Sequence, residues 1–410
     1  MNISMYKYET SVGYGKFGTK SSSQCCCDFD CFRLDICMVH SFFGSFPWRT
    51  LHKKIDYESM EENSLPGVSI IKPLLGIDQN LYSNMETFFL LNYPKFELLF
   101  CVQDEKDAVI GCVRSLIEKY PKIDARLFIG GLKVGVNPKI NNMQPAYIAS
   151  KYGLILVSDA GIRMQPDTLL DMVGVMKNDV ALVHQMPFVC DRKGFPAVLE
   201  KVYFGTAHAR IYLSADFLRI NCSTGMSALM RKDLLDEVGG IAAFGQYLAE
   251  DFFFAKSFTD RGWKLRISTQ PAWQNANTAD IETFRKRITR WAKLRIAMIP
   301  HMILLEPLSE CFVLGALASW AISHLSQVDP FAIYLFHILL WFLLDYFLLS
   351  IIQKSSLTFS KIDFVIAWLS RELFALALFT RALWEPDIQW RAGTYRLKWG
   401  GIAEEVKPKL

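Results

Sequence analysis

The chain has 410 residues, more than the roughly 250–300 that one hydrophobic core usually serves, so we expect a domain of ordinary size plus a second part. The net charge is only +4, and lysines and arginines are scattered over residues 50–300, which argues against a nucleic-acid-binding protein. Hydrophobic residues make up 51% of the sequence and concentrate after residue 300, which predicts a membrane-associated part.

Residues 1–64 carry glycine, serine, lysine and cysteine without sustained periodicity, which predicts a variable, poorly ordered segment. No basic stretch followed by an apolar run and a small-residue cleavage site occurs there, so we expect no secretory leader. Several cysteines cluster at residues 25–37, where palmitoylation and metal binding both stay open. The isolated cysteines elsewhere are typical of reduced thiols that face the cytosol.

Strand and helix patterns alternate between residues 66 and 159. The apolar runs are nearly continuous, which is typical of a parallel sheet covered by helices on both faces. We therefore predict an α/β fold with a mostly parallel sheet, in which ligands bind beyond the carboxyl ends of the strands. The strands are expected at 67–76, 96–103, 124–130 and 154–159, and the helices at 80–94, 107–121 and 144–153.

Two of these strands end in acidic residues. Asp104 and Asp107 follow the strand at 96–103, and Asp159 ends the strand at 154–159. A carboxylate that leaves a strand into the binding crevice can hold a ribose hydroxyl, or a divalent cation that nucleotide phosphates also coordinate. Ordinary turn chemistry explains an isolated aspartate equally well, so both interpretations stay open at this point.

A third acid precedes a run of phenylalanines in "AEDFFFAKSFTDRGW", residues 249–263. On a helix that ends at Gly262, Asp251 shares one stripe with Phe254 and Phe258, so its carboxylate lies on the core-facing side. A helix start alone would also favour an acid here, because it complements the free N–H groups of the first turn.

A basic segment, "FRKRITRWAKLRIAMIP", lies between this helix and the apolar region. On a helix, Arg287, Arg290 and Trp291 share one face with Leu294. One interpretation is a juxtamembrane helix that lies on anionic lipid. The other is a clamp in which the arginines hold a diphosphate leaving group and the tryptophan stacks against a substrate.

Three apolar segments follow, at 308–325, 331–352 and 362–384, each near the roughly 20 residues that cross a bilayer. Charges inside a membrane segment are costly and should face protein or water, so the third segment is a candidate for a re-entrant or interfacial helix. The charges concerned are Asp345 in the second segment and Arg371, Glu372 and Arg381 in the third.

The 354–361 loop contains two lysines, and the 326–330 connector contains none. Because positively charged loops prefer the cytosolic side of a membrane, this predicts that the loop and the domain before residue 300 face the cytosol. Three full crossings would then send the basic tail to the other side, which a re-entrant third segment avoids. The expected division is a poorly ordered segment at 1–64, a cytosolic domain at 65–300 that ends in an amphipathic helix, membrane helices at 301–385 and a basic tail at 386–410.

Taken in order, these motifs resemble the family-2-type nucleotide-sugar glycosyltransferases with the D, D, D, (Q/R)xxRW signature, and within them the members that glucosylate ceramide. The resemblance runs from about Leu65 to the C-terminus. Its most specific segments are "DARLFIGGLKVGVNPKINN", "SDAGI", "EKVYFGTAHAR", "TGMSALMRKDLL", "AEDFFFAKSFTDRGW", "RITRWAKLR" and "WRAGTYRLKWGG". It implies a nucleotide-sugar-binding, GT-A-like domain that transfers glucose from UDP-glucose to the primary hydroxyl of ceramide with inversion.

The resemblance also implies roles for the acids. The first signature acid corresponds to Asp107, with Asp104 beside it, and the second to Asp159. Both would serve the UDP-sugar and its Mg²⁺ or Mn²⁺, which Asp159 would hold together with the donor phosphates. The third, Asp251, would be the catalytic base, and its partly apolar setting should raise its pKa. Arg287, Arg290 and Trp291 would form the clamp for the diphosphate and the acceptor.

Further residues are assigned by the same resemblance. Lys139, Asn141 and Asn142 lie in a loop expected on the nucleotide side, although a solvated loop explains them almost as well. His208 lies where the acceptor would approach, although an isolated histidine is more often structural. The resemblance further implies a multi-pass protein of the Golgi or ER membrane. A processive polysaccharide synthase and a catalytically inactive lipid-binding protein stay open as alternatives.

Overall fold

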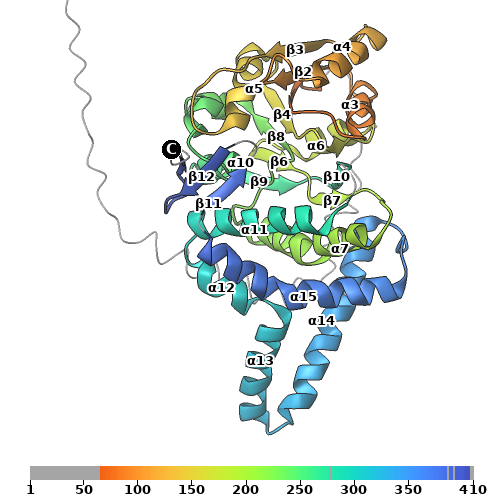
Figure 1. Ribbon diagram of the computed structural model, residues 1–410, viewed down its shortest axis with the longest axis vertical. Helices are drawn as coiled ribbons and strands as arrows, with labels where there is room; N and C mark the ends of the chain where they lie inside the picture. The colour runs from red at the N-terminus through yellow and green to blue at the C-terminus, as the bar shows by residue number, and fades with distance from the viewer. Residues whose placement is uncertain (1–64, 277–278, 386, 391–392, 407–410) are drawn as a thin grey trace, which may run out of the picture.

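A computed structural model describes residues 65–276, 279–385, 387–390 and 393–406 (Figure 1). The segment at 1–64, with its cysteine cluster, lies outside the described residues. The predicted alternation is confirmed over the first half of the domain. Its elements are β1 (Val68–Leu74), α3 (Leu81–Phe89), β2 (Phe96–Val102), α4 (Val109–Lys119), β3 (Ala125–Ile129), α5 (Pro138–Ala149) and β4 (Leu154–Ser158).

The second half of the domain completes the sheet and adds the helices that lead toward the apolar segments. Its strands are β5 (Ile162–Arg163), β6 (Val180–His184), β7 (Pro187–Val189), β8 (Ser227–Arg231), β9 (Lys264–Ile267) and β10 (Ala272–Gln274). Its helices are α6 (Thr168–Val175), α7 (Phe195–Tyr203), a π-helix (Phe204–His208), α8 (Ala209–Leu218), α9 (Lys232–Asp236), a 3₁₀ helix (Ile241–Phe244), α10 (Glu250–Thr259) and α11 (Ile281–Met298).

The main sheet has the strand order β3-β2-β1-β4-β8-β6-β9, and only β8 runs antiparallel to its neighbours. Successive side chains of a strand point to opposite faces. Ile70 and Leu98 accordingly join a core with α3, α4 and α6, while Ile71 and Leu99 join a second core with α5 and α10. The predicted α/β class with helices on both faces is therefore confirmed.

Helix α5 begins earlier than the sequence pattern indicates. The expected helix started at residue 144 and left 133–142 as a loop, but the structure starts the helix at Pro138. Asn137 caps it, since its side-chain oxygen accepts hydrogen bonds from the backbone N–H groups of Lys139 and Ile140. A capping asparagine followed by proline at the first helical position is a regular start signal. Lys139, Asn141 and Asn142 therefore lie on a helix.

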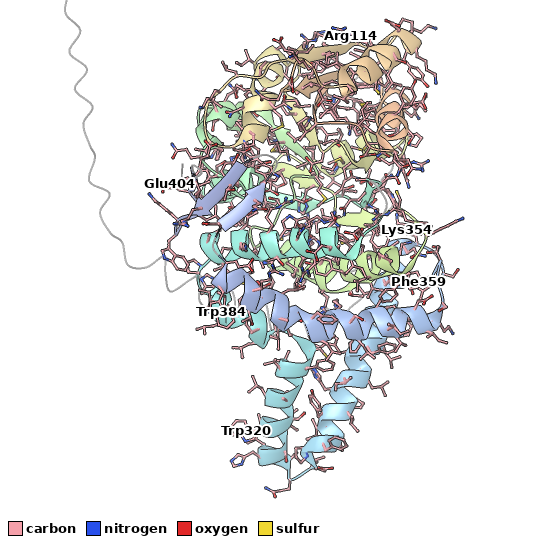
Figure 2. The ribbon with its side chains drawn as sticks, viewed as in Figure 1. Arg114, Trp320, Lys354, Phe359, Trp384 and Glu404 are labelled. Carbon is pink, nitrogen blue, oxygen red and sulfur yellow. The ribbon has the colours of Figure 1, made fainter. Side chains whose placement is uncertain are left out.

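The apolar region forms a helical hairpin and a crossing helix: α12 (Met302–Leu308), α13 (Cys311–Ser326), α14 (Pro330–Gln353) and α15 (Lys361–Trp384). By length and composition, α14 alone among the described helices could cross a membrane, or α14 together with α12 and α13 if that pair, bent by 78°, counts as one span. Helices α13 and α14 project from the domain, and large apolar side chains such as Trp320 point outward from them (Figure 2).

Helix α15 takes a different course from the hairpin. It runs across the base of the domain and packs along α7 and α11 (Figure 1). The loop before it also touches the domain, because Thr358 Oγ1 donates a hydrogen bond to Asp191 at 3.0 Å and accepts one from Lys201 at 3.2 Å. The third apolar segment therefore lies along the domain, whereas α13 and α14 project from it.

The residues after α15 form a small sheet that the sequence patterns do not predict. Strands β11 (Asp387–Trp390), β12 (Gly393–Leu397) and β13 (Ala403–Glu405) pair antiparallel. The sheet returns to the domain, since the Ala403 N–H donates to the Gln246 carbonyl oxygen at 2.9 Å and Ile402 forms a β-bridge with Tyr247. The described part of the predicted basic tail is thus an integral layer of the domain.

Candidate active site

A cavity of about 1070 Å³ lies at the carboxyl ends of β1 and β4 and extends to the start of the apolar region. Residues of α5, α8, α10, α11 and the C-terminal sheet close it. Its lining is polar at the strand ends, where Lys139, Asp159, Glu250 and Asp251 gather. Side chains such as Ile211, Leu294 and Met298 make it apolar toward α8 and the end of α11.

Asp159 stands directly after β4 at the polar end of the cavity. Its backbone is fixed on both sides, since its N–H donates to the Met226 carbonyl at 3.0 Å and its carbonyl accepts from Lys72 Nζ at 2.8 Å. One carboxylate oxygen, Oδ1, pairs with Lys139 Nζ at 2.8 Å. The side chain keeps 40% of its surface exposed, so the carboxylate is open to a ligand.

Lys139 connects the second acid with the third. Its ammonium group lies 2.8 Å from Asp159 Oδ1 and 2.9 Å from Glu250 Oε1, and it donates to the Gly225 carbonyl at 3.1 Å. Burial opposes the charge, but the two carboxylates outweigh it and raise the pKa of Lys139. The lysine is therefore a fixed cation whose three hydrogens all point at protein oxygens.

Asp251 lies in the first turn of α10, on the stripe that also carries buried Phe254 and Phe258. Its Oδ2 accepts from the Gly225 N–H at 2.6 Å and its Oδ1 from the Phe252 N–H at 2.9 Å. Burial and the negative charge of Glu250 raise the pKa of Asp251 to about 6, against the opposing effect of Lys139. The predicted upward shift is confirmed.

Gly225 makes this arrangement sterically feasible. A Cβ atom there would lie 3.2 Å from Asp251 Cβ, from Asp251 Oδ2 and from Lys139 Nζ. Such contacts are tighter than most real Cβ contacts, so a side chain would push the acid and the cation from their places. Glu250 is held as well, because Asn137 Nδ2 donates to its Oε2 at 3.0 Å.

Helix α11 brings Arg287, Arg290 and Trp291 to the same cavity, as expected from their spacing. Arg287 Nη1 donates to Gln274 Oε1 at 3.2 Å, and the guanidinium lies 5.5 Å from the Trp291 ring centroid. Within the part of the chain that the structure describes, no residue forms a hydrogen bond or an ion pair with Arg290. Its charge is available to an anionic ligand.

His208 ends the π-helix and lines the cavity between Tyr212 and Trp291. Its ring stacks on Trp291 with centroids 5.6 Å apart and tilts against Tyr212 at 4.8 Å. Burial, together with the charges of Arg295 and Arg287, lowers the pKa of His208 to about 3. The imidazole is therefore neutral at physiological pH and forms part of an aromatic wall.

Comparison with known proteins assigns the chain to a family. The family model described as glycosyl transferase family 21 matches residues 36–403. The chain belongs to this family. Ceramide glucosyltransferase 3 of Caenorhabditis elegans is 48% identical over 366 residues, which are 89% of this chain and 79% of that protein. Ceramide glucosyltransferase 1 of the same organism is 44% identical over 366 residues, 89% of this chain and 78% of that protein.

Among solved structures, the chain is similar to a mannosyltransferase of Pyrobaculum calidifontis in complex with GDP-Man and Mn²⁺. The sequence identity is 16% and the TM-score 0.46, with 86% of this chain and 99% of that chain covered. The family membership confirms the glycosyltransferase resemblance drawn from the sequence motifs. As a member of glycosyl transferase family 21, the chain is a glycosyltransferase.

Four residues that the sequence assigned to the nucleotide side do not line the cavity of this family 21 member. The Asp107 side chain binds the protein backbone, because its oxygens accept hydrogen bonds from the N–H groups of Gly76 at 2.7 Å and Val109 at 2.9 Å. Asp104 is exposed and accepts from the N–H of Lys106.

The side chains of Asn141 and Asn142 form hydrogen bonds with the protein's own backbone. The Asn141 side chain binds the backbone of Val134 and Gly135, and Asn142 Nδ2 donates to the Cys101 carbonyl at 3.0 Å. Both asparagines stabilise the loop and strand end around the site instead of opening onto the cavity. The reason is the early start of α5, which turns these side chains toward β2 and the 133–136 loop.

Glu250 and Gly225 belong to the site but are absent from the predicted set. The adjacent acids of "AED" were one available signal for Glu250, and "STGM" places a glycine where backbone must approach closely. Trp390 of β11 also lines the cavity. No local pattern indicates it, because its position depends on a sheet whose partners lie more than a hundred residues earlier.

The polar end can accommodate a divalent cation through one protein carboxylate. Among the described residues no cluster of three or more histidine, cysteine, aspartate or glutamate side chains could hold a metal alone. Asp159 offers an open carboxylate, and Arg290 faces the same space without a protein partner. One or two carboxylates plus substrate phosphates are the usual way in which enzymes hold Mg²⁺. The residues present therefore fit a cation that arrives with a nucleoside diphosphate.

Proposed function

We propose that this enzyme transfers glucose from UDP-glucose to the primary hydroxyl of ceramide, with inversion at the anomeric carbon. The observation that carries the proposal is the position of Asp251, at the boundary between the polar and apolar ends of one cavity. The curated relatives named ceramide glucosyltransferase support the choice of sugar and acceptor.

The donor lies at the polar end in this proposal. Asp159 would hold a Mg²⁺ or Mn²⁺ ion, whose charge offsets that of the diphosphate. Arg290 and Arg287 bind the phosphate oxygens of the departing UDP by charge-assisted hydrogen bonds. Arg290 is half-buried beside Asp159 and forms no hydrogen bond or ion pair with the described residues, so its N–H donors can bind a phosphate, which supports this role.

Asp251 acts as the general base. Its carboxylate accepts the proton of the ceramide hydroxyl while that oxygen forms a bond to the anomeric carbon and the bond from this carbon to the UDP oxygen breaks. One displacement of this kind inverts the anomeric centre. A pKa of about 6 supports the role, since the carboxylate is ionised at neutral pH and still basic enough to take a proton.

The acceptor lies at the apolar end, where the cavity reaches Ile299 and Met302 beside α12. A lipid with one terminal hydroxyl can then present that group to Asp251 while its chains stay in an apolar environment. A growing polysaccharide would need a polar path, so the apolar lining favours a lipid acceptor over a polymer. We further propose a multi-pass Golgi or ER membrane protein whose active site faces the cytosol, which the lysines of the 354–361 loop support.

Membranes that contain the enzyme, incubated with labelled UDP-glucose or UDP-galactose and with ceramide or diacylglycerol, test the proposal. We expect labelled glucosylceramide from the UDP-glucose and ceramide pair alone, and its loss when EDTA removes the cation. Product from another pair would revise the substrates, and labelled polymer would favour a synthase. Undiminished product in EDTA would remove the cation from the mechanism.

A further inference from the structure

A buried group of charges joins the apolar helices to the domain. Asp345 of α14 is fully buried, and its Oδ1 pairs with Arg210 of α8. Its Oδ2 accepts from Trp368 Nε1 at 2.8 Å and lies 3.1 Å from Arg371 Nη2. Arg371 also pairs with buried Glu372. We call these four residues, Arg210, Asp345, Arg371 and Glu372, the Asp345 cluster.

Asp345, Arg371 and Glu372 thus face protein, in agreement with the prediction that such charges face protein or water. The cluster pairs two acidic side chains with two arginines. Replacing such a buried group by apolar side chains is often neutral or stabilising, so its presence is a weak argument for stability and a better one for fixing one specific arrangement. The arrangement that it fixes lies next to the cavity.

The cluster holds the π-helix directly. Arg371 Nη1 donates to Thr206 Oγ1 at 2.8 Å, and Thr206 Oγ1 itself donates to the Val202 carbonyl at 2.5 Å. Beside it, Gly205 lets α14 approach so closely that a Cβ atom there would lie 2.2 Å from Leu349 Cδ1. Helices α14 and α15 therefore contact successive residues of the π-helix.

The π-helix in turn carries part of the cavity wall. Its last residue is His208, which stacks on Trp291, while Phe204 contacts the same tryptophan edge-on at 6.0 Å. Thr206 and His208 are only two positions apart in the chain. A short π-helical segment inside an α-helix is a strained and often functional feature that needs outside contacts to persist.

We propose that the Asp345 cluster positions the π-helix, and with it the aromatic wall of His208 and Trp291, so that the cavity fits the acceptor lipid. This inference rests on the proposed function, because it concerns the acceptor end of the same cavity. The residues of the cluster touch neither substrate; they are positioning residues that act through Thr206 and His208. At the donor end, Asp159 and Lys139 belong instead to the end of β4 and to α5.

Thr206→Val tests the link with the least disturbance, because it removes one hydroxyl and leaves the ion pairs in place. We expect the KM for ceramide to rise roughly five- to tenfold, as the loss of one hydrogen bond to a charged partner permits, with the KM for UDP-glucose unchanged. Asp345→Asn should give a larger change of the same kind. Thr380→Val is the matched control, since Thr380 is exposed on the same helix α15 and its Oγ1 donates to the Leu376 carbonyl of that helix.

The outcomes separate the two proposals. A rise in the ceramide KM alone, in Thr206→Val but not in Thr380→Val, supports the positioning role. Equal changes for both substrates, a fall in kcat alone or no change in Thr206→Val would overturn it, whether or not Asp345→Asn folds. Wild-type membranes that form no glucosylceramide at all would instead contradict the proposed function.

Discussion

The protein contains two groups of buried charge that are chemically alike and differ in how completely they are paired. In the Asp345 cluster both oxygens of the central carboxylate are occupied by protein donors and none of its surface is exposed. In the cavity, Asp159 leaves 40% of its side chain exposed and Arg290 has no partner among the described residues. The Asp345 carboxylate is fully occupied by protein donors, whereas Asp159 and Arg290 leave polar groups open to the ligand of the proposed function.

This difference gives a physical criterion for a site. Burying charge without a partner is costly, so a half-paired group persists only where the rest of the fold stabilises it. Lys139 supplies part of that stabilisation, because it neutralises Asp159 and Glu250 on the protein side. Asp159, Asp251 and Arg290, whose polar groups this lysine does not fully pair, all line one cavity.

The largest expected effect is at the reacting end of the open group. Asp251→Asn keeps the shape and the hydrogen bond from the Gly225 N–H but cannot accept a proton. We expect kcat to fall by roughly 10²- to 10⁴-fold, the usual contribution of a general base, measured as labelled glycolipid formed per minute. Asp179→Asn, in an exposed ion pair with Lys264 away from the cavity, is the control and should keep its activity. Comparable loss in both variants would contradict the assignment.

Arg290 of the cavity and Arg371 of the Asp345 cluster should respond to substitution in different ways. Arg290→Lys should reduce kcat/KM for UDP-glucose roughly 10- to 100-fold, because lysine cannot bind a phosphate bidentately, and should leave the apparent melting temperature nearly unchanged. Arg371→Met should instead destabilise the fold by about 3–5 kcal/mol, since it breaks a buried ion pair. Thermal unfolding of the purified protein in detergent, alongside kinetics, measures both. A destabilised Arg290→Lys would show that this arginine is structural after all.

The smallest expected effect is a shift in pH dependence. With a pKa near 6, Asp251 loses its base form as the pH falls, so kcat/KM should decrease about tenfold per unit below that value. The negative charge of Glu250 contributes to raising this pKa, so Glu250→Gln should move the acidic limb to lower pH. Profiles of both enzymes between pH 4.5 and pH 8 decide the point, and a shift to higher pH in Glu250→Gln would refute the coupling.

Much of the fold could be predicted because its strands and helices are strongly patterned. Strands such as β2 and β4 are continuous apolar runs, and α11 shows its cavity face through the spacing of Arg287, Arg290 and Trp291. The start of α5 was predicted wrongly, although an N-cap asparagine followed by proline, here Asn137 and Pro138, is a known signal for a helix start. The C-terminal sheet was not predicted, because its strands, such as Ala403–Glu405, are too short to show a clear alternation of apolar and polar residues.

For the site, sequence motifs identified the acids but not how each is used. Asp107 and Asp159 both follow a strand of the sheet, yet Asp107 binds backbone while Asp159 opens onto the cavity. That distinction depends on where Gly76 and Lys139 come to lie, which no local pattern contains. The roles assigned to Asp104, Asp107, Asn141 and Asn142 at the nucleotide therefore stay predictions.

The C-terminal sheet also constrains how the chain can thread a bilayer. Ala403 and Gln246 are joined by a 2.9 Å hydrogen bond, whereas a hydrocarbon core is about 30 Å thick, so both residues must occupy the same aqueous compartment. In the membrane arrangement that we propose, the chain between them therefore crosses the bilayer an even number of times. The bent pair of α12 and α13 together with α14 would satisfy this parity as two opposite crossings, with α15 on the side from which the chain set out.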